Sequence, residues 1–229
     1  MFLYGFTPII LDGALVTLEL AAFSLIVAFV IGLGGAGAKL SSNPVLSTIA
    51  TLYTTLIRGV PDLVLMLLIF YSLQIGMNHI TESLHLAQIN LNPFVSGVFT
   101  LGFIYGAYFT ETFRGAFLAV PKGQMEAGIA YGMTQWQTFT RIQFPQVMRF
   151  ALPGISNNCQ VMLKATALVS IIGLSDVVKA SIDAGKSSYK VFFFTIVAGV
   201  IYLLLTTLSS ILLIWLERRY ALGVREAEL

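Results

Sequence analysis

The chain has 229 residues, of which 57% are apolar and only 10% are charged, and its formal net charge is +2. A soluble domain usually carries about 25% charged residues, so this composition excludes an ordinary soluble protein. The small net charge gives no reason to expect a nucleic-acid partner. The one cysteine, Cys159, excludes a disulfide bond within the chain.

The apolar residues gather in stretches long enough to cross a membrane, for which a helix needs about 20 mostly apolar residues. Four stretches contain no Asp, Glu, Lys or Arg, and a fifth is interrupted only by Lys164. The first lacks a basic flank and is too long for a cleaved signal peptide, so we expect it to be retained. We predict an all-α integral membrane protein, a single transmembrane domain over 1–229. Its five spans are expected at about 10–37, 62–79, 94–113, 151–174 and 191–216.

The basic residues predict the orientation, because cytoplasmic segments are enriched in Lys and Arg. With the N-terminus outside, the inner segments carry nine of them: Lys39, Arg58, Arg114, Lys122, Arg141, Arg149, Arg218, Arg219 and Arg225. The outer segments carry three: Lys179, Lys186 and Lys190. The sequence therefore favours an outer N-terminus and a cytoplasmic C-terminus.

The inner segment 114–149 is too long to be only a connector, because most links between helices are short. Residues 124–131 predict a short helix ended by Gly132, which suits a positive φ. Thr134 and Gln137 match a capping box, and the second helix that they start is expected to stop before Pro145. The residues alone leave open whether this hairpin binds a partner or only covers the membrane surface.

Part of this segment resembles a known motif, the EAA loop of bacterial ATP-binding-cassette (ABC) import permeases. The matching residues, at the spacing of that motif, are Glu126, Ala127, Gly128, Gly132, Ile142 and Pro145. The sequence departs from it at Gly128, where the family has Ala, and at Phe144, where it has Leu. We expect Gly128 to loosen its helix slightly.

The resemblance covers nearly the whole chain. Segments 58–61, 106–108, 113–115 and 173–176 are similar to the polar amino-acid permeases, and the two ends of the chain resemble their Q-type subunits for histidine, lysine, arginine and ornithine. This implies a type I (MetI-like) fold in the bacterial inner membrane, with a periplasmic N-terminus. It also implies several partners: a second permease subunit (a paralogous M-type chain or another copy), two cytoplasmic ATPase subunits and a periplasmic amino-acid-binding protein, besides membrane lipid.

In that family the helix at Glu126 couples the permease to a separate ATPase, so the six motif residues are the expected coupling site. The chain itself is expected to have no ATP site and no catalytic residues. Residues 185–187 end like a P-loop, but Ala180 stands where its first glycine is required. The glycine pattern at 32–37 lacks the strand and the acid of a dinucleotide site, and close helix packing explains it better.

Charged residues inside predicted spans are candidates for the substrate path, because they are costly in a membrane. Glu19 and Lys164 are both expected near the middle of the bilayer, where transport sites lie in other transporters. Either Lys164 faces a substrate carboxylate and Glu19 a substrate cation, or the two only neutralise charges within or between subunits. Glu111 is expected near the inner face, either paired with Arg114 three residues later or acting at an inner gate or on the substrate.

The outer charged residues give weaker signals. His79 and His85 are interpreted as solvated surface, since a metal site needs more ligands at defined spacing. Asp176 and Asp183 flank a short outer helix, and either contact the binding protein or only cap and solvate that helix. No metal or cofactor is expected.

Three functional classes compete. The leading hypothesis is an ABC import permease for polar, basic amino acids, with another cationic amino acid or an opine as the alternative substrate. An ion-coupled secondary transporter would need internal repeats and broken helices, and no convincing repeat is present. An intramembrane enzyme would need a catalytic constellation inside the spans, and the sequence shows none.

Overall fold

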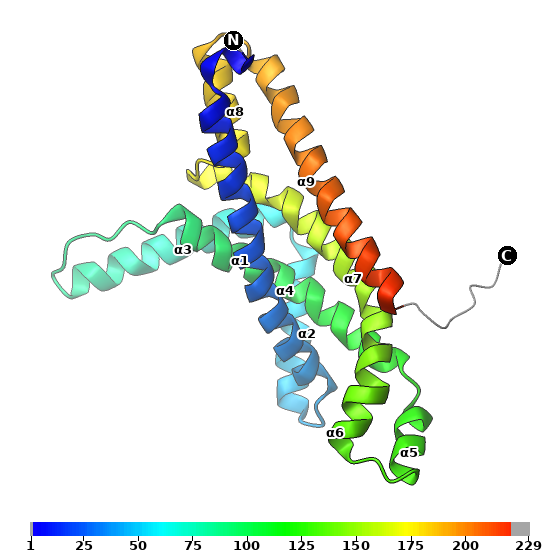
Figure 1. Cartoon of the computed structure of the whole chain (residues 1–229). Coiled ribbons are helices and arrows are strands. Elements are labelled where there is room, and N and C mark those ends of the chain that lie inside the picture. Colours follow the sequence, from blue (N-terminus) through cyan, green and yellow to red (C-terminus); the bar gives the residue numbers. More distant parts are fainter. Residues whose placement is uncertain (1, 221–229) are drawn as a thin grey trace.

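The computed structural model describes residues 2–220, and this part of the chain consists of helices with no strand. In chain order the elements are η1 (Phe2–Gly5), α1 (Thr7–Leu40), α2 (Pro44–Gly59), α3 (Asp62–Ser83), α4 (Pro93–Ala119), α5 (Lys122–Ala130), α6 (Gln135–Thr138), η2 (Phe139–Gln143), α7 (Phe144–Ala165), η3 (Thr166–Ile172), α8 (Val177–Ser187) and α9 (Val191–Tyr220) (Figure 1). The all-α prediction is confirmed. Arg225, one of the basic residues used to predict orientation, lies outside the described residues.

Four helices, α1, α3, α4 and α9, are each long and apolar enough to cross a membrane. A fifth span is available if the helical stretch Gln135–Ile172 and α8 count as one span with a bend of 53°. The sequence placed the end of this span at 174 and a separate outer helix after it. The bend arises because Gly173 adopts a φ of 103° and Asp176 then caps a new helix.

α1 and α4 cross at very short range, and glycine makes this crossing possible (Figure 1). A Cβ at Gly32 would lie 2.5 Å from Cβ of Phe109, and one at Gly106 would lie 2.6 Å from Cγ2 of Ile31. Small residues at such positions allow two helix backbones to approach closely. The interpretation of the glycine pattern as helix packing is therefore confirmed for Gly32 and Gly35, whereas Gly34 and Gly37 face open space.

The apolar interior is divided into two clusters. The larger one is centred on α4, where Tyr105 and Phe109 are fully buried. The smaller one joins η1, α1, α8 and α9 around Ile10, Val177 and Phe194. The N-terminal ends of α1 and α9 therefore form a packed unit with α8, beyond the bend.

α2 was not anticipated, because its 16 residues are too few to cross a bilayer. Asn43 caps its first turn by accepting a hydrogen bond from the N–H of Val45 at 2.9 Å. The helix ends before Val60, which adopts an extended conformation because Pro61 follows it. The segment that the sequence suggested as an inner connector is thus an amphipathic helix lying against α1 and α4.

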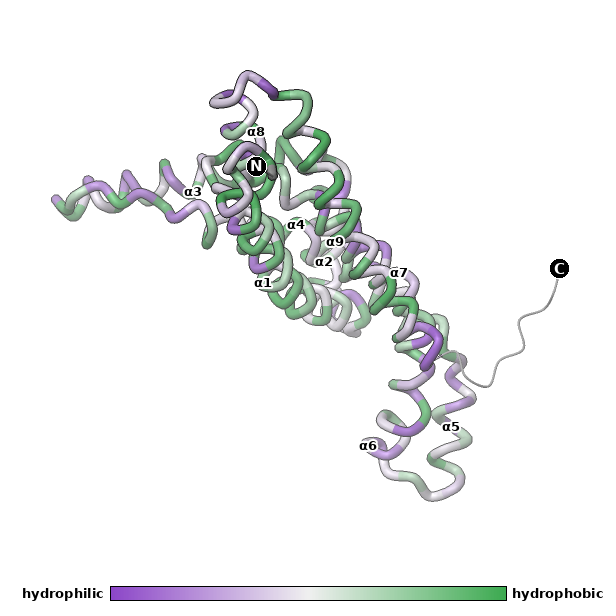
Figure 2. Tube along the Cα trace, turned by 45° about the horizontal axis from the view of Figure 1, so that its top comes forward, coloured by the Kyte–Doolittle hydropathy of each residue, from purple (hydrophilic) through white to green (hydrophobic). Residues whose placement is uncertain are grey.

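Hydropathy separates the ends of the molecule from its middle. Apolar residues dominate α1 and α9, whereas α5 and α6 at one end are mixed or polar (Figure 2). The far part of α3 reaches away from the other helices, and residues 84–92 connect it back to α4 (Figure 1). This arrangement places the α5–α6 hairpin beyond the apolar helices, where a second protein has access to it.

Candidate functional site

The α5–α6 hairpin forms as the sequence predicts. α5 ends at Ala130, and Gly132, two residues later, adopts a φ of 82°. The N–H groups of Tyr131 and Met133 donate to the carbonyls of Ala127 and Gly128, at 3.0 and 3.1 Å. These bonds satisfy the last carbonyl groups of the helix, as expected of a left-handed helix terminus. The turn between the helices is therefore fixed by its own hydrogen bonds.

The capping box at the start of α6 is also confirmed. The Thr134 hydroxyl accepts a hydrogen bond from the N–H of Gln137 at 3.3 Å, and the Gln137 side chain accepts one from the N–H of Thr134 at 3.0 Å. The expected stop before Pro145 is wrong. The chain passes through a π-helical turn, η2, in which the N–H of Phe144 donates to the carbonyl of Phe139, and continues into α7. Pro145 stands where this π-helical turn passes into α7, and such a local change in the hydrogen-bond pattern lets a continuous helix accommodate a proline.

The structure brings two parts of the EAA-like motif together. Gly128 is buried against η2, and a Cβ there would lie 2.7 Å from Cδ1 of Ile142 and 3.3 Å from the hydroxyl of Thr138. This close contact leaves no space for a side chain and so explains the glycine at position 128, which the sequence alone did not. Pro145 lies half-buried in the first turn of α7. The hairpin is thus attached to the start of α7 by its own motif residues.

Outside the contact at Gly128, much of the α5–α6 hairpin is open. Glu126 and Ala127 are exposed, and so are three larger side chains: Ile129, Tyr131 and Trp136. Tyr131 is 90% exposed and Trp136 is 72% exposed, with its ring stacked on Phe139 at a centroid distance of 5.9 Å. A group of exposed large apolar side chains with one carboxylate is typical of a protein-binding surface. We call Glu126, Ala127, Ile129, Tyr131 and Trp136 the α5 surface.

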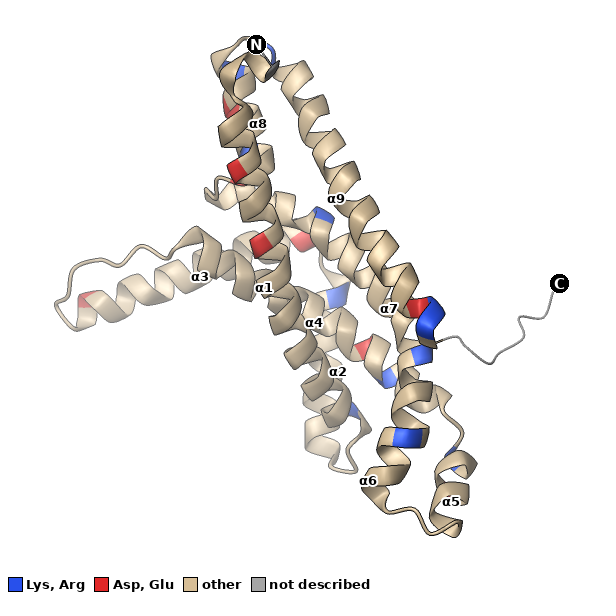
Figure 3. Cartoon of the chain, in the orientation of Figure 1, with Lys and Arg blue, Asp and Glu red and all other residues tan. Residues whose placement is uncertain are grey.

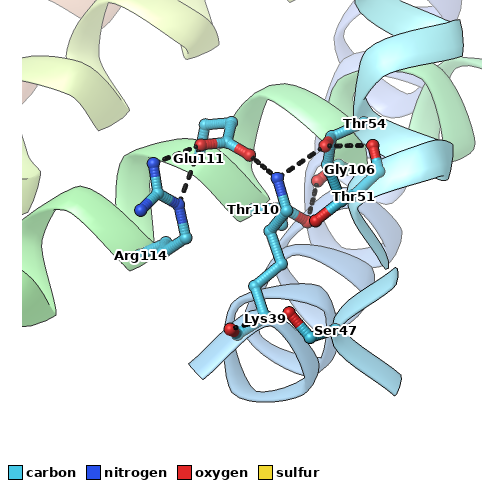
Figure 4. A network of polar contacts seen from close by, with 8 residues as sticks. All are labelled: Lys39, Ser47, Thr51, Thr54, Gly106, Thr110, Glu111 and Arg114. Atoms are coloured by element: carbon cyan, nitrogen blue, oxygen red, sulfur yellow. Dashed lines mark hydrogen bonds and ion pairs between the residues drawn. The ribbon is translucent and has the colours of Figure 1, made fainter. Parts of the chain in front are cut away.

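Glu111 is the centre of a charged network that joins three helices (Figure 4). Its carboxylate pairs with Arg114 at 2.9 Å, as predicted, and also with Lys39 at the end of α1. The Lys39 ammonium in turn donates to the hydroxyl of Thr54 on α2 at 2.8 Å. With two cationic partners, Glu111 is a link between α1, α2 and α4. Lys39 was missed because nothing in the sequence connects residues 72 positions apart.

Glu19 and Lys164 are not brought together. Both side chains are exposed, and no ion pair within residues 2–220 involves either. On α7, Asn157 is also exposed seven residues before Lys164, so the two share one helix face. Pairing within the chain therefore does not account for these charges, and their roles as substrate contacts or as partners across subunits stay predictions.

A polar cluster that was not predicted from the sequence lies at the break between α2 and α3. The hydroxyl of Tyr105 donates to the carboxylate of Asp62 at 2.9 Å, and the guanidinium of Arg58 lies 5.4 Å from the ring centroid of Tyr108. Pro61 separates the two helices and so places Arg58 and Asp62 on either side of the break. The signal that could have revealed it is the arginine, proline and aspartate within five residues of an apolar region.

Two further charged candidates, Asp176 and Asp183, lie at the start of α8 and within it. Asp176 is fully buried and accepts a hydrogen bond from the N–H of Lys179 at 2.9 Å, so it caps α8 and is not open to a soluble partner. Asp183 is exposed and lies 3.7 Å from the Lys179 ammonium. Among the described residues, no three of His, Cys, Asp and Glu are grouped to hold a metal ion.

The family follows from comparison with known proteins. Residues 21–222 match the family described as binding-protein-dependent transport system inner membrane component. The chain belongs to this family of transport permeases. The predicted resemblance and the location in the inner membrane are thereby confirmed.

Relatives and solved structures agree with this assignment. The permease protein HisQ of the histidine/lysine/arginine/ornithine transport system of Salmonella typhimurium is 64% identical over 99% of this chain and 100% of its own length. An amino acid ABC transporter solved with histidines has a chain that is 32% identical, with a TM-score of 0.78, over 93% of this chain and 94% of its own. The MetNI methionine ABC transporter has a chain that is 15% identical, with a TM-score of 0.65, over 92% of this chain and 97% of its own. This last likeness shows the fold alone, and with it the MetI-like prediction is confirmed.

Proposed function

We propose that this permease carries histidine, lysine, arginine and ornithine as part of an ABC importer. The observation that supports it most strongly is the 64% identity to HisQ over 99% of the chain. The nopaline permease NocQ of Agrobacterium fabrum and the octopine permease OccQ of Rhizobium radiobacter are only 38% and 36% identical. The basic amino acids are therefore favoured over opines as substrates.

ATP hydrolysis is assigned to separate subunits. The described residues contain no strand in front of Gly185, as a P-loop requires. A Cβ at Gly185 would lie 2.8 Å from Cα of Val191, so close packing of the α8–α9 turn explains this glycine. The proposed assembly contains two permease subunits, the second of M type, two cytoplasmic ATPase subunits and a periplasmic binding protein.

The α5 surface is proposed to receive the force from the ATPase. Because Gly128 packs on Ile142, a displacement of α5 must also move η2. The stretch from Gln135 to Ile172 is helical without interruption, so this displacement reaches α7. α7 carries Lys164, which with Glu19 is proposed to lie on the substrate path. Such a rigid connection suits a rocking transition between inward-facing and outward-facing states.

The experiment is uptake of radiolabelled arginine and histidine by the complete transporter in proteoliposomes, with ATP hydrolysis measured in parallel. Glu126→Gln removes the one carboxylate of the α5 surface, so we expect uptake and ATPase stimulation by the loaded binding protein to fall together. Glu82→Gln, which removes an exposed carboxylate at the far end of α3, is the matched control and should transport normally. Glu19→Gln should weaken uptake of cationic substrates while assembly persists.

Uptake without ATP or without an ATPase subunit would contradict the proposal and would favour an ion-coupled transporter. Equal effects of Glu126→Gln and Glu82→Gln would disprove the coupling role of the α5 surface. Unchanged uptake of arginine and histidine by Glu19→Gln would exclude Glu19 from the substrate path.

A further inference from the structure

An apolar groove runs between α1, α7 and α9, away from the α5 surface. Its volume is about 370 Å³, and its walls include Ala22 of α1, Leu163 of α7, and Leu208 and Leu212 of α9. The small side chains of α1 leave this space open. Hydrocarbon is a suitable occupant, because removing the apolar walls of the groove from water is favourable.

The α9 wall of the groove continues into an aromatic and a basic residue. Leu208, Leu212, Trp215 and Arg219 are separated by three or four residues, so they form one stripe along the helix. The Arg219 guanidinium lies 5.8 Å from the ring centroid of Trp215. Tryptophan and arginine are enriched at the membrane–water interface, where an apolar ring and a charged head meet the lipid headgroups.

The end of α9 beyond the groove is positively charged, and we call this region the mouth of the groove. Basic residues gather at the end of α9 and on the neighbouring part of α7 (Figure 3). Arg149, Arg218 and Arg219 are exposed there, and the one carboxylate among them, Glu217, accepts a hydrogen bond from Ser156 of α7. Arg149 precedes Ser156 by two helical turns, so it lies on the face of α7 that meets α9. Three arginines and one carboxylate leave this mouth with an excess of positive charge.

The geometry points to a binding site for one anionic phospholipid, with an acyl chain in the groove between α1, α7 and α9 and a phosphate between Arg149 and Arg219. Along α9, Leu212 lies about 10 Å from Arg219 at 1.5 Å per residue, which is within the length of an acyl chain. A zwitterionic lipid would leave the excess charge of the mouth uncompensated, whereas an anionic headgroup neutralises it. Basic pockets between spanning helices on the cytoplasmic side bind such headgroups.

Two simpler explanations cover only part of these observations. Arginines in the last turn of α9 interact favourably with the helix dipole, and the orientation rule places basic residues at this end. Neither explains why Arg149 lies on the face of α7 that meets α9, or why the apolar wall of the groove and Arg219 share one stripe of α9. The inference requires only that the chain is embedded in a membrane with this end of α9 on the cytoplasmic side, so it does not depend on which amino acid is carried.

The test is photocrosslinking of the complete transporter in nanodiscs, with a diazirine on the acyl chain of either phosphatidylglycerol or phosphatidylcholine. We expect crosslinks to the groove residues from phosphatidylglycerol in preference to phosphatidylcholine. Arg149→Gln and Arg219→Gln should each reduce this preference about fivefold, the contribution of one basic residue near a lipid surface. Arg141→Gln, which removes an exposed arginine of η2 outside the groove, is the matched control. Ala22→Leu should reduce the groove crosslinks by occupying the space of the acyl chain.

Several outcomes would overturn the proposal. Equal crosslinking by the two lipids, or an Arg141→Gln effect as large as that of Arg219→Gln, would show general attraction to the membrane surface. Groove crosslinks that persist in Ala22→Leu would place the lipid elsewhere. If cysteines introduced in the groove form disulfides with the second permease subunit, that subunit occupies the groove instead. The assay does not measure transport, so its failure and a failure of the proposed substrate can be told apart.

Discussion

Glu111 shows how a charge inside an apolar chain is stabilised by residues that lie far away in the sequence. Its carboxylate has an i,i+3 partner in Arg114, but the pair with Lys39 is what joins α4 to α1 and, through Thr54, to α2. Its side chain is 18% exposed, so water screens these ion pairs only partly. The exposed pair of Lys179 and Asp183 is the useful contrast, since its groups stand in solvent.

We expect Glu111→Gln to lower the free energy of unfolding by about 2–3 kcal/mol, because it leaves two cations without their carboxylate. Asp183→Asn should change it by less than about 1 kcal/mol, as is usual for surface ion pairs. Thermal unfolding of the purified complex measures both. If the two variants are equally stable, Glu111 does not hold the three helices together, and a gating role for this residue gains support.

At the scale of elements, close approach of backbones decides how α1 meets α4. Gly32 and Gly34 stand two positions apart on α1, yet only Gly32 faces α4. A Cβ at Gly32 would meet the Cβ and the backbone of Phe109, which cannot move aside, whereas one at Gly34 meets nothing within 4 Å. The same principle explains why Gly128 allows α5 to pack on η2.

Gly32→Ala should therefore destabilise the permease by about 1–3 kcal/mol, the usual cost of overpacking a tight contact. Gly34→Ala should be neutral or stabilise it by up to about 1 kcal/mol, because alanine favours a helix. The melting temperatures of the two variants give the comparison. A Gly32→Ala protein as stable as Gly34→Ala would mean that the helices do not cross as closely as described.

At the scale of the whole molecule, the five candidate spans separate two ends. The α5 surface lies at one end, and the turn between α8 and α9 lies at the other (Figure 1). Each end carries one highly exposed tyrosine, Tyr131 at 90% and Tyr189 at 96%. The positive-inside rule assigns the Tyr131 end to the cytoplasm.

This orientation predicts the labelling of two cysteine variants by a reagent that cannot cross membranes. In a Cys159→Ala background, Tyr189→Cys should react in intact spheroplasts, and Tyr131→Cys should react only in inside-out vesicles. The opposite pattern would place the α5 surface outside the cell, where no ATPase can reach it. The proposed coupling would then be excluded.

The sequence by itself determined the membrane class, the helical fold, the hairpin with Gly132 and its capping box, and the family. These depend on composition, local periodicity and short motifs, all of which act over a few neighbouring residues. It could not predict α2, the continuation of α6 through η2 into α7, the contact of Gly128 with Ile142, or the pair of Lys39 with Glu111. Each of these depends on where distant helices meet. Only the tertiary structure decided them, because packing can override a local stop signal and can pair charges 72 residues apart.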